Sequence, residues 1–319
     1  MARSRCGQPT LRPMECVNEA EAAVLIALLH ARPRKMSWSA IASEVALRGS
    51  ATALWDECFP PTLEGVNDLD GHLARAWESL EAWRSEDFKL LTVLDGGYPS
   101  RLREIHQVPP IVFVRGQLRD DEVAVSVVGS RRASDRGRAV AARIAEGLVD
   151  RGIAVLSGLA EGIDAAAHTA TLKAGGRPIG VIGTGINRSY PAGNRTLQAE
   201  VAKRGAVVSQ FWPDAPPQKH SFPMRNATMS GLGRASIVVE AGEHSGARIQ
   251  ARLAVEHGRP VILTDMVVGA TTWARDLLTR PGVYLANSTA ELMDLVDQLT
   301  QTAAGVDDWS NVLPDLVDH

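Results

Sequence analysis

The sequence predicts an α/β fold in which a doubly wound, mostly parallel sheet follows a small all-helical region. Short apolar runs such as Val123–Val128 and Ile153–Leu156 alternate with helical segments over the second half of the chain. Such runs are typical of parallel strands that helices cover on both faces, and their alternation with helices predicts a parallel sheet. Glycines directly after these runs let backbone approach a ligand, and the helix that follows presents N–H groups to an anion.

The individual elements follow this alternation in order. Ser134 is expected to be the N-cap of a helix that extends to Asp150, and Gly175-Gly176 is expected to end the helix at 164–174. Upstream, FKLLTVLDGGYPSRLREI predicts a short strand, a turn and a helix, and VPPIVFVRG predicts a further strand. Later strands are expected at 178–182, 206–209, 237–240, 261–263 and 283–285, and later helices at 195–204, near 226, and at 246–257, 271–279 and 289–300.

The chain divides into four regions. Residues 1–14 lack periodicity and are expected to be disordered, and residues 15–90 to form a small helical domain. We expect residues 91–302 to form the sheet domain and residues 303–319 a loose acidic tail. Four of the seven tryptophans lie in the helical region; they could form a platform for nucleobases, but anchors of a small apolar core are the favoured interpretation. These tryptophans are Trp38, Trp55, Trp77 and Trp83.

Composition excludes several classes of protein. A net charge of −3 gives no overall attraction to nucleic acid, so such binding must come from a local patch. The apolar run Ala22–Leu29 is far short of the roughly 20 residues that span a bilayer, and no membrane association is expected. Three cysteines without zinc-ligand spacing predict a reduced, cytoplasmic protein with no metal site.

The end of the first strand of the sheet domain carries the clearest candidate for a ligand contact. VVGSRR contains neither a dinucleotide fingerprint nor a P-loop, and the chain has neither elsewhere. Arg131 follows Gly129 at a carboxyl edge, where open α/β sheets bind ligands, and its guanidinium could hold a phosphate through two hydrogen bonds. Arginines 136–143 are interpreted as a solvated helix face.

Further candidate sites lie at later turns. In SGLAEGIDAAAH, Asp164 and His168 share a helix face and could form an acid/base pair; a capping Asp164 and a buried His168 are the favoured interpretation. GTGINRSYPAGN offers glycines with Asn194 and Arg195 at a helix start. QKHSFPMRN places cations beside Phe222, a pattern typical of phosphate contact with base stacking, although Phe222 could simply belong to the core. In VVEAGEHSGARIQA, Ser245-Gly246 forms another anion-receptive turn at a helix start.

These motifs resemble, in order and spacing, the DNA-processing protein family DprA (Smf). GSR at 129–131, SGLAEGIDAAAH, GTGINRSYPAGN, FPMRN with SGL, and VVEAGEHSG carry the resemblance, which covers about residues 98–260. The resemblance implies an extended Rossmann-like fold, binding of single-stranded DNA and help in loading the RecA recombinase during natural transformation. It also implies a homodimer, no catalysis and no cofactor.

The resemblance assigns Arg131 to the arginine of the family's GSR motif and residues 222–226 to its FP-x-RN segment. The turn glycines correspond to Gly158, Gly162, Gly183 and Gly185. With the candidates from the residues themselves, the expected DNA- and phosphate-binding set is Gly129, Ser130, Arg131, Ser157, Gly158, Gly162, Gly183, Gly185, Asn194, Arg195, Lys219, Phe222, Arg225, Asn226, Ser245 and Gly246.

The chain also departs from the family pattern. Ala227 stands where the family usually has an arginine, which is expected to remove a cation from the pocket. The usual Val-Pro-Gly turn is replaced by VILTDMVVGATT. The C-terminal winged-helix module that is usual in the family is not expected here. These departures indicate a diverged member.

Two rival functions remain open. LOG-like proteins have a Rossmann-like pocket that hydrolyses nucleotides with a P-G-G-x-G-T-x-x-E segment, but here Arg248 and Gln250 stand where the carboxylate is expected. A sensor that binds a nucleotide without hydrolysing it is the third possibility. Whether an oligonucleotide or a free mononucleotide saturates the site discriminates among them.

Overall fold

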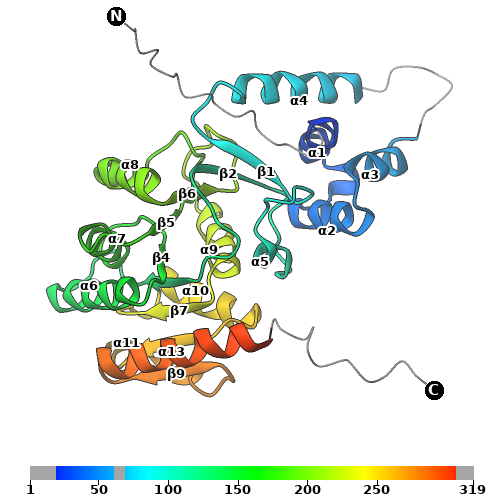
Figure 1. Cartoon of the computed structure of the whole chain (residues 1–319). Coiled ribbons are helices and arrows are strands. Elements are labelled where there is room, and N and C mark those ends of the chain that lie inside the picture. Colours follow the sequence, from blue (N-terminus) through cyan, green and yellow to red (C-terminus); the bar gives the residue numbers. More distant parts are fainter. Residues whose placement is uncertain (1–18, 61–68, 307–319) are drawn as a thin grey trace, which may run out of the picture.

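A single nine-stranded sheet organises the computed structural model, which describes residues 19–60 and 69–306 (Figure 1). The strand order is β1-β2-β6-β5-β4-β3-β7-β8-β9. Its strands are β1 (Lys89–Thr92), β2 (Ile111–Gly116), β3 (Ala124–Val128), β4 (Ala154–Ser157), β5 (Pro178–Val181), β6 (Ala206–Ser209), β7 (Ala235–Val238), β8 (Val261–Thr264) and β9 (Val283–Ala286).

The predicted α/β class with a mostly parallel sheet is confirmed. All neighbouring pairs from β6 to β9 are parallel, with Val125 opposite Val155 and Ala235. The exceptions are β1 and β2: β2 runs antiparallel to both β1 and β6, with Phe113 opposite Ser209. The strand order reverses at β3, from which the chain proceeds first towards β6 and then to β7, and ligands bind at such a switch point in open α/β sheets.

Helices cover both faces of the sheet. On one face, apolar side chains of α6 (Asp135–Asp150), α7 (Ile163–Lys173) and α13 (Thr289–Val306) form one core with β3, β4 and β7. The helices α9 (Ser221–Leu232) and α10 (Gly246–Glu256) pack together on the opposite face, and α8 (Arg195–Arg204) packs on β5 and β6 (Figure 1). The short helix η2 (Ala192–Asn194) precedes α8. After β8 the sequence predicts one helix at 271–279, whereas the structure has two, α11 (Asp265–Ala270) and α12 (Thr272–Leu277). Two helices form because Thr271 between them is extended, with φ −136° and ψ 145°.

Within its described residues, 19–60 and 69–90, the helical region comprises four α-helices and a short 3-10 helix. Ser37 and Ser50 cap α2 and α3 by accepting hydrogen bonds from Ala40 N and Ala53 N, both at 3.1 Å. The helices are α1 (Glu19–Ala31), η1 (Pro33–Lys35), α2 (Trp38–Arg48), α3 (Ala51–Cys58) and α4 (Leu69–Trp83), and the later α5 (Ser100–Arg103) follows β1.

The core of the helical region is continuous with that of the sheet. Trp83 packs edge to face on Phe113 of β2, with ring centroids 5.1 Å apart, and Trp38 does the same on Trp212 at 5.0 Å. Trp55 is 7% exposed, so three of the four tryptophans act as apolar anchors, while Trp77 is 43% exposed. The division at residue 90 remains a proposal, since β1 already begins at Lys89. The predicted disordered start, 1–14, lies outside the described residues; so does the predicted acidic tail, apart from residues 303–306, which belong to α13.

Candidate phosphate and nucleic-acid site

An open cavity of about 510 Å³ lies at the carboxyl ends of β3 and β7, beside the N-terminal ends of α9 and α10. The structure brings half of the sequence-predicted site residues to its walls. These eight are Gly129, Ser130, Arg131, Phe222, Arg225, Asn226, Ser245 and Gly246. These residues belong to three motifs that are far apart in the sequence, at 129–131, 222–226 and 245–246, and the fold brings them to one cavity.

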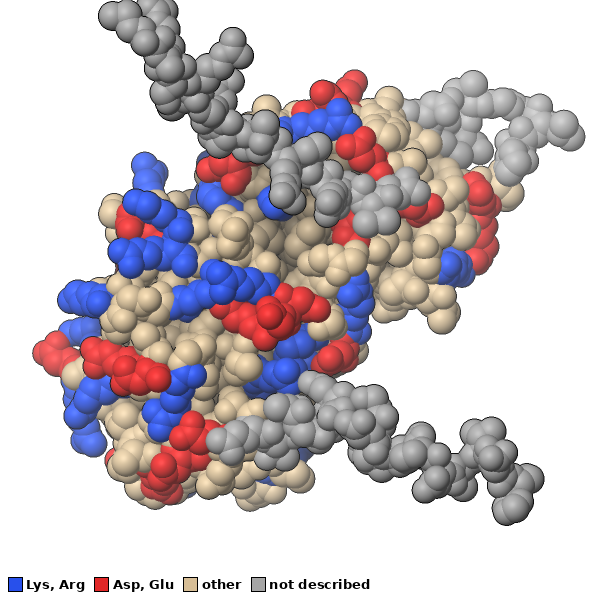
Figure 2. Space-filling model, in the orientation of Figure 1, with Lys and Arg blue, Asp and Glu red and all other residues tan. Residues whose placement is uncertain are grey.

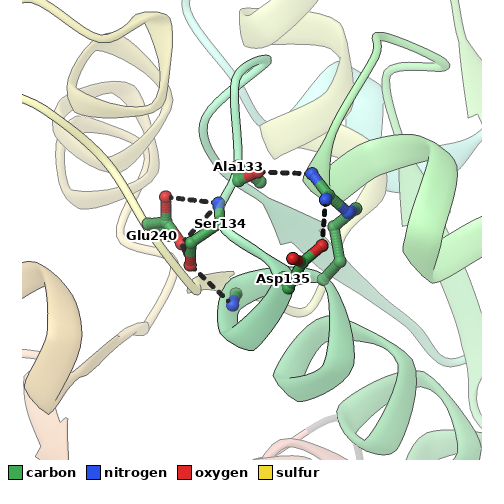
Figure 3. A network of polar contacts seen from close by, with 6 residues as sticks. Ala133, Ser134, Asp135 and Glu240 are labelled. Atoms are coloured by element: carbon green, nitrogen blue, oxygen red, sulfur yellow. Dashed lines mark hydrogen bonds and ion pairs between the residues drawn. The ribbon is translucent and has the colours of Figure 1, made fainter.

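The loop after β3, which carries Arg131, is held by Glu240 at the end of the neighbouring strand (Figure 3). The backbone N–H of Ser130 donates to the carbonyl oxygen of Glu240 at 2.6 Å. The Glu240 carboxylate accepts from Ser134 N at 3.0 Å and from Ser134 Oγ at 2.6 Å. Ser134 is the N-cap of α6, as predicted, and accepts from Gly137 N at 2.9 Å. A carboxylate at a helix N-terminus is favoured by the helix dipole, so Glu240 fixes both the loop and the start of α6.

Gly162 brings the start of α7 against the same loop. Ile163 N donates to Ser130 O at 3.2 Å, and a Cβ on Gly162 would lie 2.2 Å from that oxygen. The φ of Gly162 is also +77°, a conformation that other residues rarely adopt. This predicted site glycine therefore acts by permitting close backbone packing that fixes the Arg131 loop.

The side chain of Arg131 is exposed and lies over an aromatic ring. Its Cζ is 4.9 Å from the centroid of Phe222, within the range of a cation–π interaction. The Phe222 ring is 5.7 Å from that of Tyr190, which is 43% exposed. A cation and two partly accessible rings thus line one opening, an arrangement typical of sites that bind a phosphate beside a stacked base.

A second arginine, Arg225, lies beneath this surface and is only 6% exposed. Its Nη1 donates to Val181 O at 3.3 Å, while its Nε has no hydrogen-bond partner within residues 19–60 and 69–306. A Cβ on Gly158 would lie 1.3 Å from Nη1, so only glycine leaves room for the guanidinium there. Burial lowers the pKa of Arg225, the charge of Asp164 opposes this shift, and Arg131 adds to it.

Asp164 is the buried counter-charge of this cavity. Its Oδ2 accepts from Gly158 N at 3.1 Å and Ala160 N at 3.4 Å. The prediction that Asp164 caps its own helix is wrong, because Gly162 occupies the cap position of α7 and the carboxylate binds the preceding loop. Burial raises the pKa of Asp164; the charge of Arg225 is the strongest opposing influence.

His168 follows one turn later on α7 and is fully buried, as the favoured interpretation predicted. Burial lowers its pKa to about 4, which leaves the ring neutral at physiological pH. The Ser157 backbone opposes this shift, although neither ring nitrogen reaches hydrogen-bond geometry with any residue that the structure describes. His168 is therefore a packed core side chain.

The other predicted site residues lie around or away from the cavity. Gly158 and Gly183 line a small adjoining cavity of about 80 Å³ that shares Arg131, Phe222 and Arg225 with the first. Three more predicted residues contact the backbone of neighbouring segments. Ser157 Oγ donates to Val127 O at 2.6 Å, and Asn194 Nδ2 donates to Leu159 O at 2.9 Å. Gly185 packs on the carbonyl groups of Trp212 and Pro213.

Two predicted cations lie elsewhere. Arg195 lines a separate cavity of about 430 Å³ together with Arg115 and Lys203, so the structure does not bring it to Arg131. Lys219 is exposed just before α9 and lines none of the cavities described. The expectation that Ala227 removes a cation from the pocket is wrong, because Ala227 faces a different groove on the other side of α9.

Sequence reasoning missed several residues of this site. Arg132, Met229, His244 and Gln250 also line the cavity, and Arg132 could have been found from its place beside Arg131. Nothing in the local pattern showed that Glu240 holds the loop. Within residues 19–60 and 69–306, no three His, Cys, Asp or Glu residues are grouped so that they could hold a metal ion. None of the helices in these ranges combines the length and the hydropathy of a transmembrane segment.

The sheet and the arginine-lined cavity at its carboxyl edge define a Rossmann-like α/β protein with a site suited to an anionic ligand. The family of DNA recombination-mediator protein A matches residues 89–301, and the chain belongs to this family, which includes the DprA and Smf proteins.

Curated relatives show the same kinship. The chain is 38% identical to DNA processing protein DprA of Streptococcus pneumoniae over 60% of this chain and 65% of that protein. It is 38% identical to Protein Smf of Synechocystis sp. over 58% of this chain and 48% of that protein. The matched regions thus span about half to two thirds of these relatives.

Solved structures agree in fold. DprA of Streptococcus pneumoniae superposes with a TM-score of 0.61 at 30% identity, covering 86% of this chain and 92% of that one. DprA of Helicobacter pylori superposes with a TM-score of 0.60 at 21% identity, covering 67% of this chain and 97% of that one. The Rossmann-like architecture is therefore shared.

Proposed function

We propose that this protein binds single-stranded DNA in the cavity around Arg131. The observation that carries the proposal is the exposed Arg131 guanidinium 4.9 Å over the Phe222 ring, above the buried Arg225. A phosphate would meet Arg131, and an unstacked base would lie against Phe222 and Tyr190. Aromatic stacking favours single strands because the bases of a duplex are already stacked on one another.

The attraction to the strand is local. Figure 2 shows basic and acidic side chains interspersed over the face in view, in keeping with a net charge of −3. Among the residues that line the cavity, Arg131, Arg132 and Arg225 outnumber the single carboxylate, Asp164. A binding site of this kind concentrates phosphate without charging the whole molecule.

The role we propose is processing of incoming DNA in natural transformation and recombination, with loading of the RecA recombinase. It rests on membership of the DprA family and on the Streptococcus pneumoniae and Bacillus subtilis relatives that bear the name DNA processing protein. The Helicobacter pylori homologue is described as binding single-stranded DNA. Action as a cytoplasmic homodimer without catalysis belongs to the same proposal.

Nucleotide hydrolysis is the competing function. The position where a LOG-like enzyme would need a carboxylate is occupied by Gln250, which is 1% exposed and whose Nε2 donates to Ser236 Oγ at 3.3 Å. An amide cannot act as a general base or stabilise a cationic sugar as a carboxylate does. This favours binding without turnover.

The test is a titration with labelled oligothymidylate and with free mononucleotide at several salt concentrations. Arg131→Ala should weaken oligonucleotide binding and reduce the dependence of log affinity on log salt by about 0.7, the value for one phosphate of a single strand. Phe222→Ala should lose about 1–3 kcal/mol if the ring stacks on a base, with the salt dependence nearly unchanged.

An exposed arginine away from the cavity, Arg143 on α6, provides the matched control. Arg143→Ala should bind as the parent does. Equal affinity and equal salt dependence of a folded Arg131→Ala variant and the parent would refute the proposal, as would turnover of a nucleotide by pure protein.

A further inference from the structure

A second groove of about 310 Å³ lies on the other side of α9, between that helix, α10 and the start of α2. Pro223, Met224 and Ala227 of α9 line this groove, whereas Phe222 and Asn226 line the DNA cavity. The first turn of α9 therefore separates the two sites, and a ligand that passes over this turn would reach both.

The lining of the groove has the chemistry of a base-binding site. Trp38 supplies an aromatic surface, and its ring is fixed by edge-to-face packing on Trp212 at 5.0 Å. Met224 is 37% exposed on the opposite wall. Arg252 is the only charged residue among those lining the groove, and its Nε lies 3.6 Å from Glu256 on the same helix, outside the lining. An apolar slot with one cation suits a planar aromatic group attached to a phosphate.

A basic segment leads directly into this groove. Arg32, Arg34 and Lys35 are exposed, and the chain reaches Trp38 three residues later. All three cations have left-handed backbone, with φ of 46°, 52° and 59°. Such a conformation is uncommon outside glycine, and it persists where surrounding structure over-determines it, often at functional sites. Arg34 is 3.7 Å from Glu57.

We propose that the groove is a second base subsite for the same single-stranded DNA, with a phosphate held by Lys35 and Arg252. The strand would cross the first turn of α9 beside the exposed Lys219, which lies two residues before this helix. This explains why the predicted cation Lys219 lies outside the first cavity. The proposal rests on the proposed function, and it makes the helical region part of the DNA-binding surface.

The test compares oligothymidylates of increasing length on the full chain. Lys35→Glu and Met224→Glu change exposed side chains, and Arg143→Glu on α6 is the matched charge control. Short oligonucleotides that fill only the Arg131 cavity should bind all three variants as they bind the parent. Beyond a threshold length, Met224→Glu should lose between about fivefold and about 150-fold in affinity, the range for one stacked base. Lys35→Glu should also bind long strands more weakly than the parent does, with a smaller dependence of affinity on salt, as expected for a lost phosphate contact.

An abasic scan locates the base contact. A long oligonucleotide without bases at its distal positions should bind the parent as weakly as the intact one binds Met224→Glu, and Met224→Glu should lose nothing further. The proposal is overturned if folded Lys35→Glu and Met224→Glu bind long strands as Arg143→Glu does, or if they weaken short strands equally. The proposed function fails separately, if the parent binds no oligonucleotide of any length.

Discussion

The loop after β3 and the loop after β4, which both contribute to the cavity, are each held by a carboxylate, but in different environments. The loop after β3 is held by Glu240, which is partly exposed and satisfies the N-terminal turn of α6 through several hydrogen bonds. The loop after β4 is held by Asp164, which is 5% exposed and faces the buried Arg225. Arg131, on the loop after β3, is exposed and can meet a ligand. Arg225, which lies on α9 and faces the loop after β4, is buried and supports the cavity from within. The cost of removing each carboxylate should therefore differ widely.

The largest effect is expected for Asp164→Ala. It leaves the buried guanidinium of Arg225 without its counter-charge and two loop N–H groups without an acceptor. Leaving a buried charge without compensation costs about 3–5 kcal/mol. Asp164→Asn keeps an acceptor for the loop N–H groups, and the raised pKa of Asp164 shows that its charge is disfavoured by burial, so we expect Asp164→Asn to cost clearly less than Asp164→Ala in chemical denaturation. If Asp164→Asn is as stable as the parent, the carboxylate acts only through its hydrogen bonds.

The next largest effect is a loss of folding stability at acid pH, caused by the buried His168 on α7. The pKa of His168 is about 4 in the fold and about 6.5 when unfolded. Between these values only the unfolded chain binds the proton, so stability falls as the pH drops from about 6.5 to about 4. At 1.36 kcal/mol per pKa unit, the full loss approaches about 3 kcal/mol.

Two other groups affect this measurement. Asp164 acts in the opposite direction, because its raised pKa lets the fold hold a proton more tightly than the unfolded chain does. His257 also has a pKa lowered to about 4, mainly by burial, but is only half-buried and should contribute less. Denaturation of His168→Gln between pH 7 and pH 4 should show a visibly shallower slope than the parent; an unchanged slope contradicts the assignment.

The smallest effect is expected on the β3 side. Glu240→Gln keeps an acceptor for Ser134 but loses the charge at the start of α6, which should cost about 1 kcal/mol. Ser134→Ala should cost about 0.5–2 kcal/mol as the loss of an N-cap. Both should weaken oligonucleotide binding only by loosening the Arg131 loop. A loss above about 4 kcal/mol for Glu240→Gln would remove the contrast with Asp164.

Much of the fold was predictable because its signals are local. The apolar runs that form β3 to β9, the helices between them and the Ser134 cap each depend on a few consecutive residues. The same holds for the order of the glycine and arginine motifs, which was enough to predict that Arg131, Phe222 and Arg225 belong to one site. Parallel strands all present their carboxyl ends at one edge, so the topology itself brings such motifs together.

Tertiary structure decided what depends on distant partners. Glu240 lies 106 residues from Ser134, and only the pairing of β3 with β7 brings them into contact. The local sequence favours Asp164 as a helix cap, but the loop before α7 turns the N–H groups of Gly158 and Ala160 towards its carboxylate. Ala227 was assigned to the wrong side of α9, because the face that a helix presents to a cavity depends on its packing against α10. The helical region is joined to the sheet by the contacts of Trp38 and Trp83 with Trp212. These contacts and the antiparallel placement of β2 also depend on distant partners. Burial of apolar surface selects such partners, and the local sequence does not distinguish among them.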